Sequence, residues 1–101
     1  MPKIFEYLGI ILFFYANEHE PIHVHARKGE FETKAEFIIL NGKVVEIRLR
    51  SVKGAKPLKG ADLKNFKVFL DQCAESVVQK WIDFFVLKKN VAFEKITKKL
   101  R

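Results

Sequence analysis

The sequence predicts an α+β fold, in which a mainly antiparallel sheet of three to five strands packs in two layers against one long C-terminal helix. Three observations predict it. Apolar and polar residues alternate with a period of two in the first half of the chain, glycine and proline interrupt residues 51–60, and apolar residues then recur every three or four positions. With 101 residues, 49% of them hydrophobic, the chain is long enough for one core and too short for a second domain.

We therefore expect residues 1–101 to form a single domain, with its core at about residues 2–89 and a basic C-terminal extension at residues 90–101. The net charge of +7 favours partners that carry phosphate or carboxylate groups. The single cysteine, Cys73, favours a reducing compartment over a disulfide scaffold. The apolar stretch Ile10–Tyr15 is too short for a signal peptide or a spanning helix, so we expect a cytoplasmic protein without a membrane partner.

Two strands are expected before the first hairpin turn. The segment Gly9–Tyr15 is apolar on both alternating faces, which is typical of a central strand covered on both sides. The next segment alternates strictly and predicts a half-buried strand. Its apolar residues are Ile22, Val24 and Ala26, and its polar residues are His23, His25 and Arg27.

Lys28 and Gly29 are expected to form a two-residue turn after this strand, because glycine readily adopts the positive φ that hairpin turns require. The same alternation continues in the segment after the turn, so apolar residues meet apolar residues across the hairpin. The polar pairs predicted by this turn are His25 with Glu32, Arg27 with Glu30, and His23 with Lys34.

The next turn contains Asn41 and Gly42. A two-residue loop there would oppose Phe37 to Glu46, so we expect a three-residue loop with a bulged glycine, which reverses the parity of the pairing. The apolar face of these two strands then holds Ala35, Phe37, Ile39, Val45, Ile47 and Leu49. The opposite face of the sheet collects His23, His25, Arg27, Lys34, Arg48 and Arg50.

A long amphipathic helix is predicted to begin at Asp62, a residue type that favours helix starts, and to end near Lys88 to Asn90. Its broad apolar face should pack on the sheet, with Trp81 in the core. Residues 91–100 fit an edge strand, a terminal helix or a partner-facing arm. We favour an edge strand followed by a frayed basic end.

The three histidines lie within seven residues and are the most informative feature of the sequence. On a strand, His23 and His25 project side by side. Imidazoles with pKa values near ~6.5 can act as base and acid at neutral pH, so we predict that His23 and His25 form an acid/base pair acting on a phosphodiester. Glu32 would orient His25, and His19 with Glu18 would close the site. The predicted phosphate contacts are Arg27, Lys34, Arg48 and Arg50.

Two other interpretations of the histidines stay open. His19, His23 and His25 could bind a divalent zinc, iron or nickel ion. The basic neighbours disfavour a dication, so we expect no cofactor. Alternatively, the histidines are half-exposed sheet residues without chemistry. The chain is then a non-enzymatic module that binds nucleic acid or protein, and whether it is an enzyme is open at this point.

The run Asn17-Glu18-His19-Glu20-Pro21-Ile22-His23-Val24-His25 resembles the bacterial domain of unknown function 4160. Further residues match the pattern of the same family, and the resemblance covers about residues 2–87. They are Pro2, Ile4, Phe5, Gly9, Phe13, Phe14, Tyr15, Gly29, Trp81, Phe84 and Phe85. The chain departs from the family pattern at Ala16, where serine is frequent, and in the length of its tail.

This resemblance implies no established activity. Genes of this family often lie beside another small gene, as in toxin–antitoxin pairs, and the resemblance implies the same arrangement here. A neighbouring gene is an association and gives no mechanism. The expected partners are therefore RNA and a small cognate protein encoded nearby, and the sequence leaves a homo-oligomer open.

Overall fold

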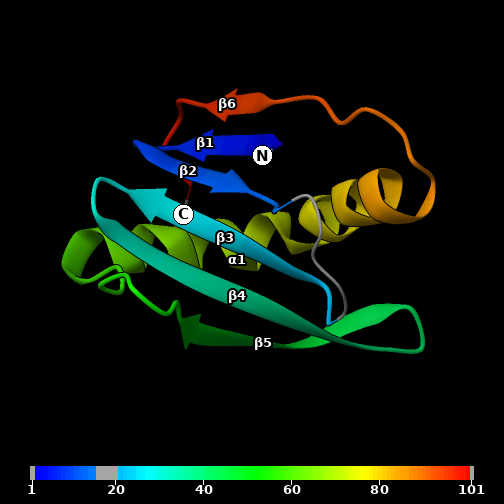
Figure 1. Ribbon diagram of the computed structural model, residues 1–101, viewed down its shortest axis with the longest axis horizontal. Coiled ribbons are helices and arrows are strands. Elements are labelled where there is room, and N and C mark those ends of the chain that lie inside the picture. Colours follow the sequence, from blue (N-terminus) through cyan, green and yellow to red (C-terminus); the bar gives the residue numbers. More distant parts are fainter. Residues whose placement is uncertain (1, 16–20, 101) are drawn as a thin grey trace.

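The computed structural model describes residues 2–15 and 21–100. The described elements, in chain order, are β1 (Lys3–Tyr7), β2 (Ile10–Phe13), β3 (His23–Lys28), β4 (Phe31–Leu40), β5 (Lys43–Ser51), α1 (Gly60–Trp81), a π-helical segment (Ile82–Val86) and β6 (Glu94–Ile96). The strands form one sheet in the order β5-β4-β3-β2-β1-β6. Figure 1 shows α1 crossing one face of this sheet, so the two-layer α+β prediction is confirmed.

The described sheet has six strands, more than the predicted three to five. The additional strand β1 was not predicted from the sequence. This strand pairs with β2 through a two-residue turn at Leu8 and Gly9, where both residues have positive φ, 51° and 83°. Leucine is an unusual residue for such a turn, so the sequence contains only a weak hairpin signal there. With β1 and β3 on its two sides, β2 takes the central position predicted for residues 9–15.

The predicted pairing of β3 with β4 is wrong by two residues. His25 opposes Lys34, whereas the prediction set it opposite Glu32. The loop consists of Gly29 and Glu30, with a φ of 61° at Gly29. Glycine is thus the first loop residue, its position in a type II′ turn. A two-residue shift keeps the parity of the strand, so the predicted faces are correct.

The predicted three-residue loop between β4 and β5 is also wrong. Asn41 and Gly42 form a two-residue loop with φ values of 53° and 78°, as in a type I′ turn. The expected change of parity occurs inside the strand, because a bulge at Val45 separates the pairs Ile38–Glu46 and Ile39–Val44. The bulge returns Ile47 and Leu49 to the apolar face as predicted. Val45 itself is 58% exposed, which contradicts its predicted place on that face.

The main core lies between α1 and the sheet. The helix begins at Gly60, two residues before the predicted start, and Asp62 lies in its first turn, where it accepts a hydrogen bond from Lys28 Nζ at 2.9 Å. The π-helical segment extends it to Val86, close to the predicted end. Trp81 is 5% exposed, which confirms its predicted core position. The fully buried residues of α1 in this core include Phe66, Phe69 and Val77.

The C-terminal segment forms the predicted edge strand. β6 pairs in parallel with β1, with Phe5 opposite Glu94. The expected frayed end is not found up to residue 100, because the Leu100 backbone N–H donates to the Tyr7 hydroxyl at 2.8 Å and its side chain packs against the core. Over residues 2–15 and 21–100, no helix is long and apolar enough to cross a membrane.

Candidate functional site

The sheet face turned away from α1 carries a second, smaller cluster of buried side chains. His25 of β3 lies between Phe13 of β2 and Lys34 of β4 in the pairing. Its ring stacks on Phe13, with centroids 5.5 Å apart, and meets Tyr15 edge-to-face at 4.5 Å. Phe13 is completely buried. Strand β3 is therefore buried on both faces, and the predicted half-buried strand is corrected to a buried one.

Glu32 is the polar centre of this cluster and is only 7% exposed. Its Oε2 accepts hydrogen bonds from His25 Nδ1 at 3.1 Å and from the Tyr15 hydroxyl at 3.2 Å. Its Oε1 lies 3.4 Å from Nε of Arg27. The predicted contact between Glu32 and His25 is thus present, although the two residues are diagonal neighbours in the ladder. A buried carboxylate with these partners holds the His25 ring in one orientation.

The hydrogen bonds define which nitrogen of each histidine carries a proton. His23 Nδ1 lies 2.7 Å from the Pro21 carbonyl oxygen, and His25 Nδ1 contacts the Glu32 carboxylate. Both oxygens act as acceptors here, so Nδ1 donates in each ring. In a neutral ring, Nε2 is then the nitrogen that can accept a proton. The ring centroids are 5.3 Å apart, which brings the predicted acid/base pair together.

Both histidines are more buried than predicted, at 5% exposure each. The interpretation that described them as half-exposed is therefore wrong on this point. For His25 the reason is the aromatic wall formed by Phe13 and Tyr15, which follow one another at a spacing of two on the histidine face. Continuing the alternation of β2 by two residues would have found Tyr15 from the sequence.

The environment of Tyr15 raises its pKa above the ordinary value of 10.0. Burial is the first cause, and the negative charge and hydrogen-bond acceptance of Glu32 add to it. Arg27 acts in the opposite direction with a smaller effect. The phenol therefore stays neutral and remains a hydrogen-bond donor to Glu32 across the physiological pH range.

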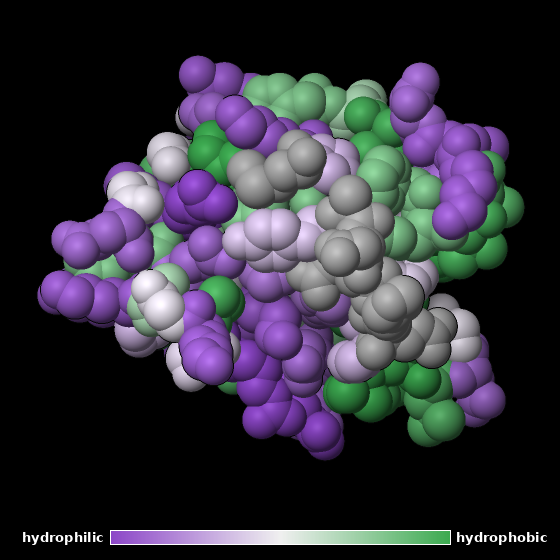
Figure 2. Space-filling model, viewed as in Figure 1, coloured by the Kyte–Doolittle hydropathy of each residue, from purple (hydrophilic) through white to green (hydrophobic). Residues whose placement is uncertain are grey.

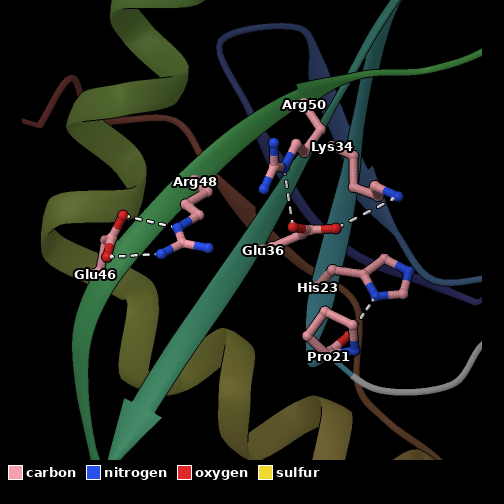
Figure 3. Close-up of polar contacts among 7 residues, drawn as sticks. All are labelled: Pro21, His23, Lys34, Glu36, Glu46, Arg48 and Arg50. Atoms are coloured by element: carbon pink, nitrogen blue, oxygen red, sulfur yellow. Dashed lines mark hydrogen bonds and ion pairs between the residues drawn. The ribbon is translucent and has the colours of Figure 1, made fainter.

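The predicted phosphate-binding face holds carboxylates as well as cations. In Figure 3, Glu36 lies between Arg50 and Lys34, with distances of 3.1 Å and 3.7 Å. Arg48 pairs with Glu46 at 2.8 Å. Figure 2 shows the resulting hydrophilic area over β4 and β5. Glu36 was not among the predicted site residues, although it shares the polar face of β4 with Lys34.

The cations also hold the pKa of Glu36 below its ordinary value of 4.5. Burial raises this pKa, but the hydrogen bond and charge of Arg50, with the charges of Lys34 and His23, lower it by more in total. Glu36 is therefore ionised at neutral pH. A phosphate group approaching Lys34 or Arg50 would have to compete with this carboxylate.

The described residues contain no group of three His, Cys, Asp or Glu side chains arranged to hold a metal ion. Of the predicted ligand set, His23 and His25 are described, whereas His19 lies outside the described residues, as does Glu18. The predicted roles of His19 and Glu18 therefore stay predictions. In the described part of the site, Nδ1 of both histidines is already engaged with oxygen.

One family model matches the chain, over residues 9–82, and its description is "Domain of unknown function (DUF4160)". The match spans the chain from the start of β2 to the end of α1, including every described residue of the histidine cluster. No curated protein and no solved structure matches the chain.

Proposed function

The chain belongs to the family of the domain of unknown function DUF4160, and from its histidine cluster we propose that it is an acid/base enzyme that cleaves phosphodiester bonds in RNA. One observation carries the proposal: two imidazoles lie 5.3 Å apart, and one of them is held by a buried carboxylate. A carboxylate that accepts from Nδ1–H sets the tautomer in which Nε2 can remove a proton. Proton transfer by such groups contributes about 10²–10⁴-fold to rate.

In the proposed reaction, Nε2 of His25 takes the proton of a ribose 2′-hydroxyl. The 2′-oxygen attacks phosphorus, and the protonated His23 gives its Nε2 proton to the departing 5′-oxygen. The products are a 2′,3′-cyclic phosphate and a free 5′-hydroxyl, so no metal or co-reactant is required. Arg27, whose side chain is 42% exposed, would offset the charge that develops on the phosphoryl oxygens.

The burial of His23 and His25 adds a step to this mechanism. With 5% exposure, the rings meet RNA only in a form of the protein that uncovers them. If that form makes up about 1% of the population, apparent substrate affinity falls about 100-fold. We therefore expect slow turnover in the isolated protein, with acceleration by any partner that favours the uncovered form.

A nucleic-acid-binding module without catalysis is the second candidate. It would use Lys34, Arg48 and Arg50, and their exposure supports it. The ion pairs with Glu36 and Glu46 weigh against it, because binding phosphate would break them. A toxin role with a small cognate protein, and a cytoplasmic location, belong to the same proposal; their support is the family resemblance, the lone cysteine and the charge.

The test is cleavage of a labelled RNA by untagged protein in the presence of a chelator. We expect cyclic-phosphate products, a loss of about 100-fold or more in His25→Asn and His23→Asn, and a smaller loss in Glu32→Gln. Lys64→Ala, at an exposed position of α1 on the other side of the sheet, is the control and should change the rate less than about 3-fold. DNA of the same sequence should resist, because it lacks the 2′-hydroxyl nucleophile.

Three outcomes would contradict the proposal. RNA that stays intact, or activity that survives His25→Asn, would remove the acid/base mechanism. Cleavage that disappears with the chelator and returns with a divalent ion would favour the metal interpretation. Salt-sensitive RNA binding without cleavage, weakened by Arg48→Ala but not by His25→Asn, would establish the binding module instead.

A further inference from the structure

The two edges of the described sheet differ in length. β6 is a three-residue strand and carries the charged residues Glu94 and Lys95. β5 is nine residues long, Lys43–Ser51, and has a strand neighbour, β4, on one side only among the described strands. Long edge strands present unpaired N–H and C=O groups that another strand can bind, whereas very short, charged edges are protected. β5 is therefore the edge suited to pairing.

A groove lined by both apolar and charged residues runs between β5 and α1 beside this edge. One part has a volume of about 410 Å³ and the next part about 230 Å³, and both are lined by Ile47 of β5 and Leu70 of α1. Leu49 lines the smaller part, and Val45, 58% exposed, lines the larger. Apolar side chains thus lie along the free edge, where a paired strand would cover them.

The charged side chains of β5 favour a second copy of β5 as the partner strand. Glu46 and Arg48 stand on either side of Ile47 in the strand, and their side chains are 51% and 49% exposed. Glu46 also lines the larger part of the groove. Figure 3 shows the two side chains together on this strand. If a second β5 pairs antiparallel with Ile47 opposite Ile47, Glu46 of each copy faces Arg48 of the other. A pairing centred on Arg48 would oppose two arginines, which is unfavourable.

We propose that the protein forms a homodimer in which β5 of each copy pairs antiparallel with β5 of the other, centred on Ile47. The two-fold axis then passes between the Ile47 residues, perpendicular to the sheet, and the two sheets become continuous. Both α1 helices lie on the same side, so the two grooves face each other. The bulge at Val45 limits the regular pairing to the middle of the strand. His23, His25 and Arg27 take no part in this contact, so the dimer is independent of the proposed catalysis.

Sedimentation equilibrium over about 1 to 100 µM protein tests the dimer. Glu46→Arg and Arg48→Glu should each weaken association by about 10-fold or more, because each opposes like charges twice across the two-fold axis. The double variant, Glu46→Arg with Arg48→Glu, restores complementary pairs and should restore the dimer. Glu30→Arg makes the same charge change at an exposed turn residue and should leave the dimer unchanged.

Mixing the two single variants gives the sharpest result. A Glu46→Arg chain offers two cations and an Arg48→Glu chain offers two anions, so the mixture should form heterodimers at concentrations at which each variant alone associates only weakly. Wild-type protein that stays monomeric at the highest concentration overturns the proposal. So does a dimer that tolerates both single variants, or a double variant that stays monomeric while its circular dichroism shows a folded chain.

Discussion

Glu32 organises the residues around it because its carboxylate is buried. Removing a carboxylate from water is costly unless hydrogen bonds and opposite charges replace the solvent. Here His25, Tyr15 and Arg27 supply them. The three side chains come from β3 and from the segment that follows β2, so a single acceptor on β4 joins both to its own strand. Any change at Glu32 should therefore be detectable at the other members of the cluster.

The titration of Tyr15 provides the first such measurement. Its pKa is raised above 10.0, first by burial and then by Glu32. Glu32→Gln should lower it towards 10.0 without reaching the value of a free tyrosine, because the contribution of burial remains. Phenolate absorbance in a Tyr7→Phe background would follow Tyr15 alone. A Tyr15 pKa at or below 10.0 in the parent protein would contradict the geometry.

The same shift has a consequence for stability. A group whose pKa is higher in the folded than in the unfolded chain contributes stability that is complete below the unfolded value and is lost as pH rises through the folded value. For Tyr15 this loss begins near pH 10.0. Tyr15→Phe should remove the contribution of Tyr15 to the decrease in unfolding free energy at alkaline pH. A decrease that is unchanged in this variant would contradict that contribution.

Among the elements, β5 shows how one extra residue reconciles a tight turn with the right faces. The type I′ loop at Asn41 and Gly42 alone would set charged residues of β5 on the core side. The bulge at Val45 reverses the alternation after two residue pairs. As a result Ile47 opposes Phe37 and Leu49 opposes Ala35 on the apolar face. With this sequence, the two-residue turn places Ile47 and Leu49 on the apolar face only because the bulge follows it.

Deletion of Val45 should therefore be tolerated. Pairing on both sides of the bulge keeps its register when this residue is removed, and Val45 is largely exposed. We therefore expect the free energy of unfolding to fall by less than about 1 kcal/mol. Deletion of Arg48 is the matched control. This deletion moves Leu49 onto the polar face, so we expect the free energy of unfolding to fall by more than about 3 kcal/mol. Urea denaturation measures both, and equal losses would refute the role given to the bulge.

At the scale of the whole molecule, the sheet separates two environments. The face towards α1 carries the large apolar core, and the opposite face carries the histidine cluster with its aromatic wall. Trp81 belongs to the first environment, yet its Nε1 has no hydrogen-bond partner among the described residues. The indole thus contributes apolar area at the cost of one desolvated N–H group.

Two substitutions separate these effects at Trp81. Trp81→Ala should lower the unfolding free energy by about 3–5 kcal/mol, because it leaves a cavity in the core. Trp81→Phe keeps most of the apolar volume and removes the unpaired N–H, so its loss should stay below about 2 kcal/mol. Thermal or urea unfolding measures both. A loss below about 1 kcal/mol for Trp81→Ala would contradict the packing of α1 on the sheet.

The alternation of residues determined much of this protein by itself. Period two in β3, β4 and β5 set which side chains share a face, and the 3.6-residue period placed Trp81 on the core side of α1. These are local properties of the chain, so the fold class and the common face of His23 and His25 followed from them. The contact of Glu32 with His25 was also predictable, because a shift of two residues leaves both on that face.

Tertiary structure alone decided the register, the burial and the charge balance of the site. The register depended on which residues of each turn adopt positive φ, at Gly29 and at Asn41. Burial of His25 depended on Phe13 and Tyr15, which the hairpins bring from an earlier strand. Arg50 of the polar face acquired Glu36 as a partner only once β4 and β5 were aligned. Such contacts join residues distant in the chain, and no local period encodes them.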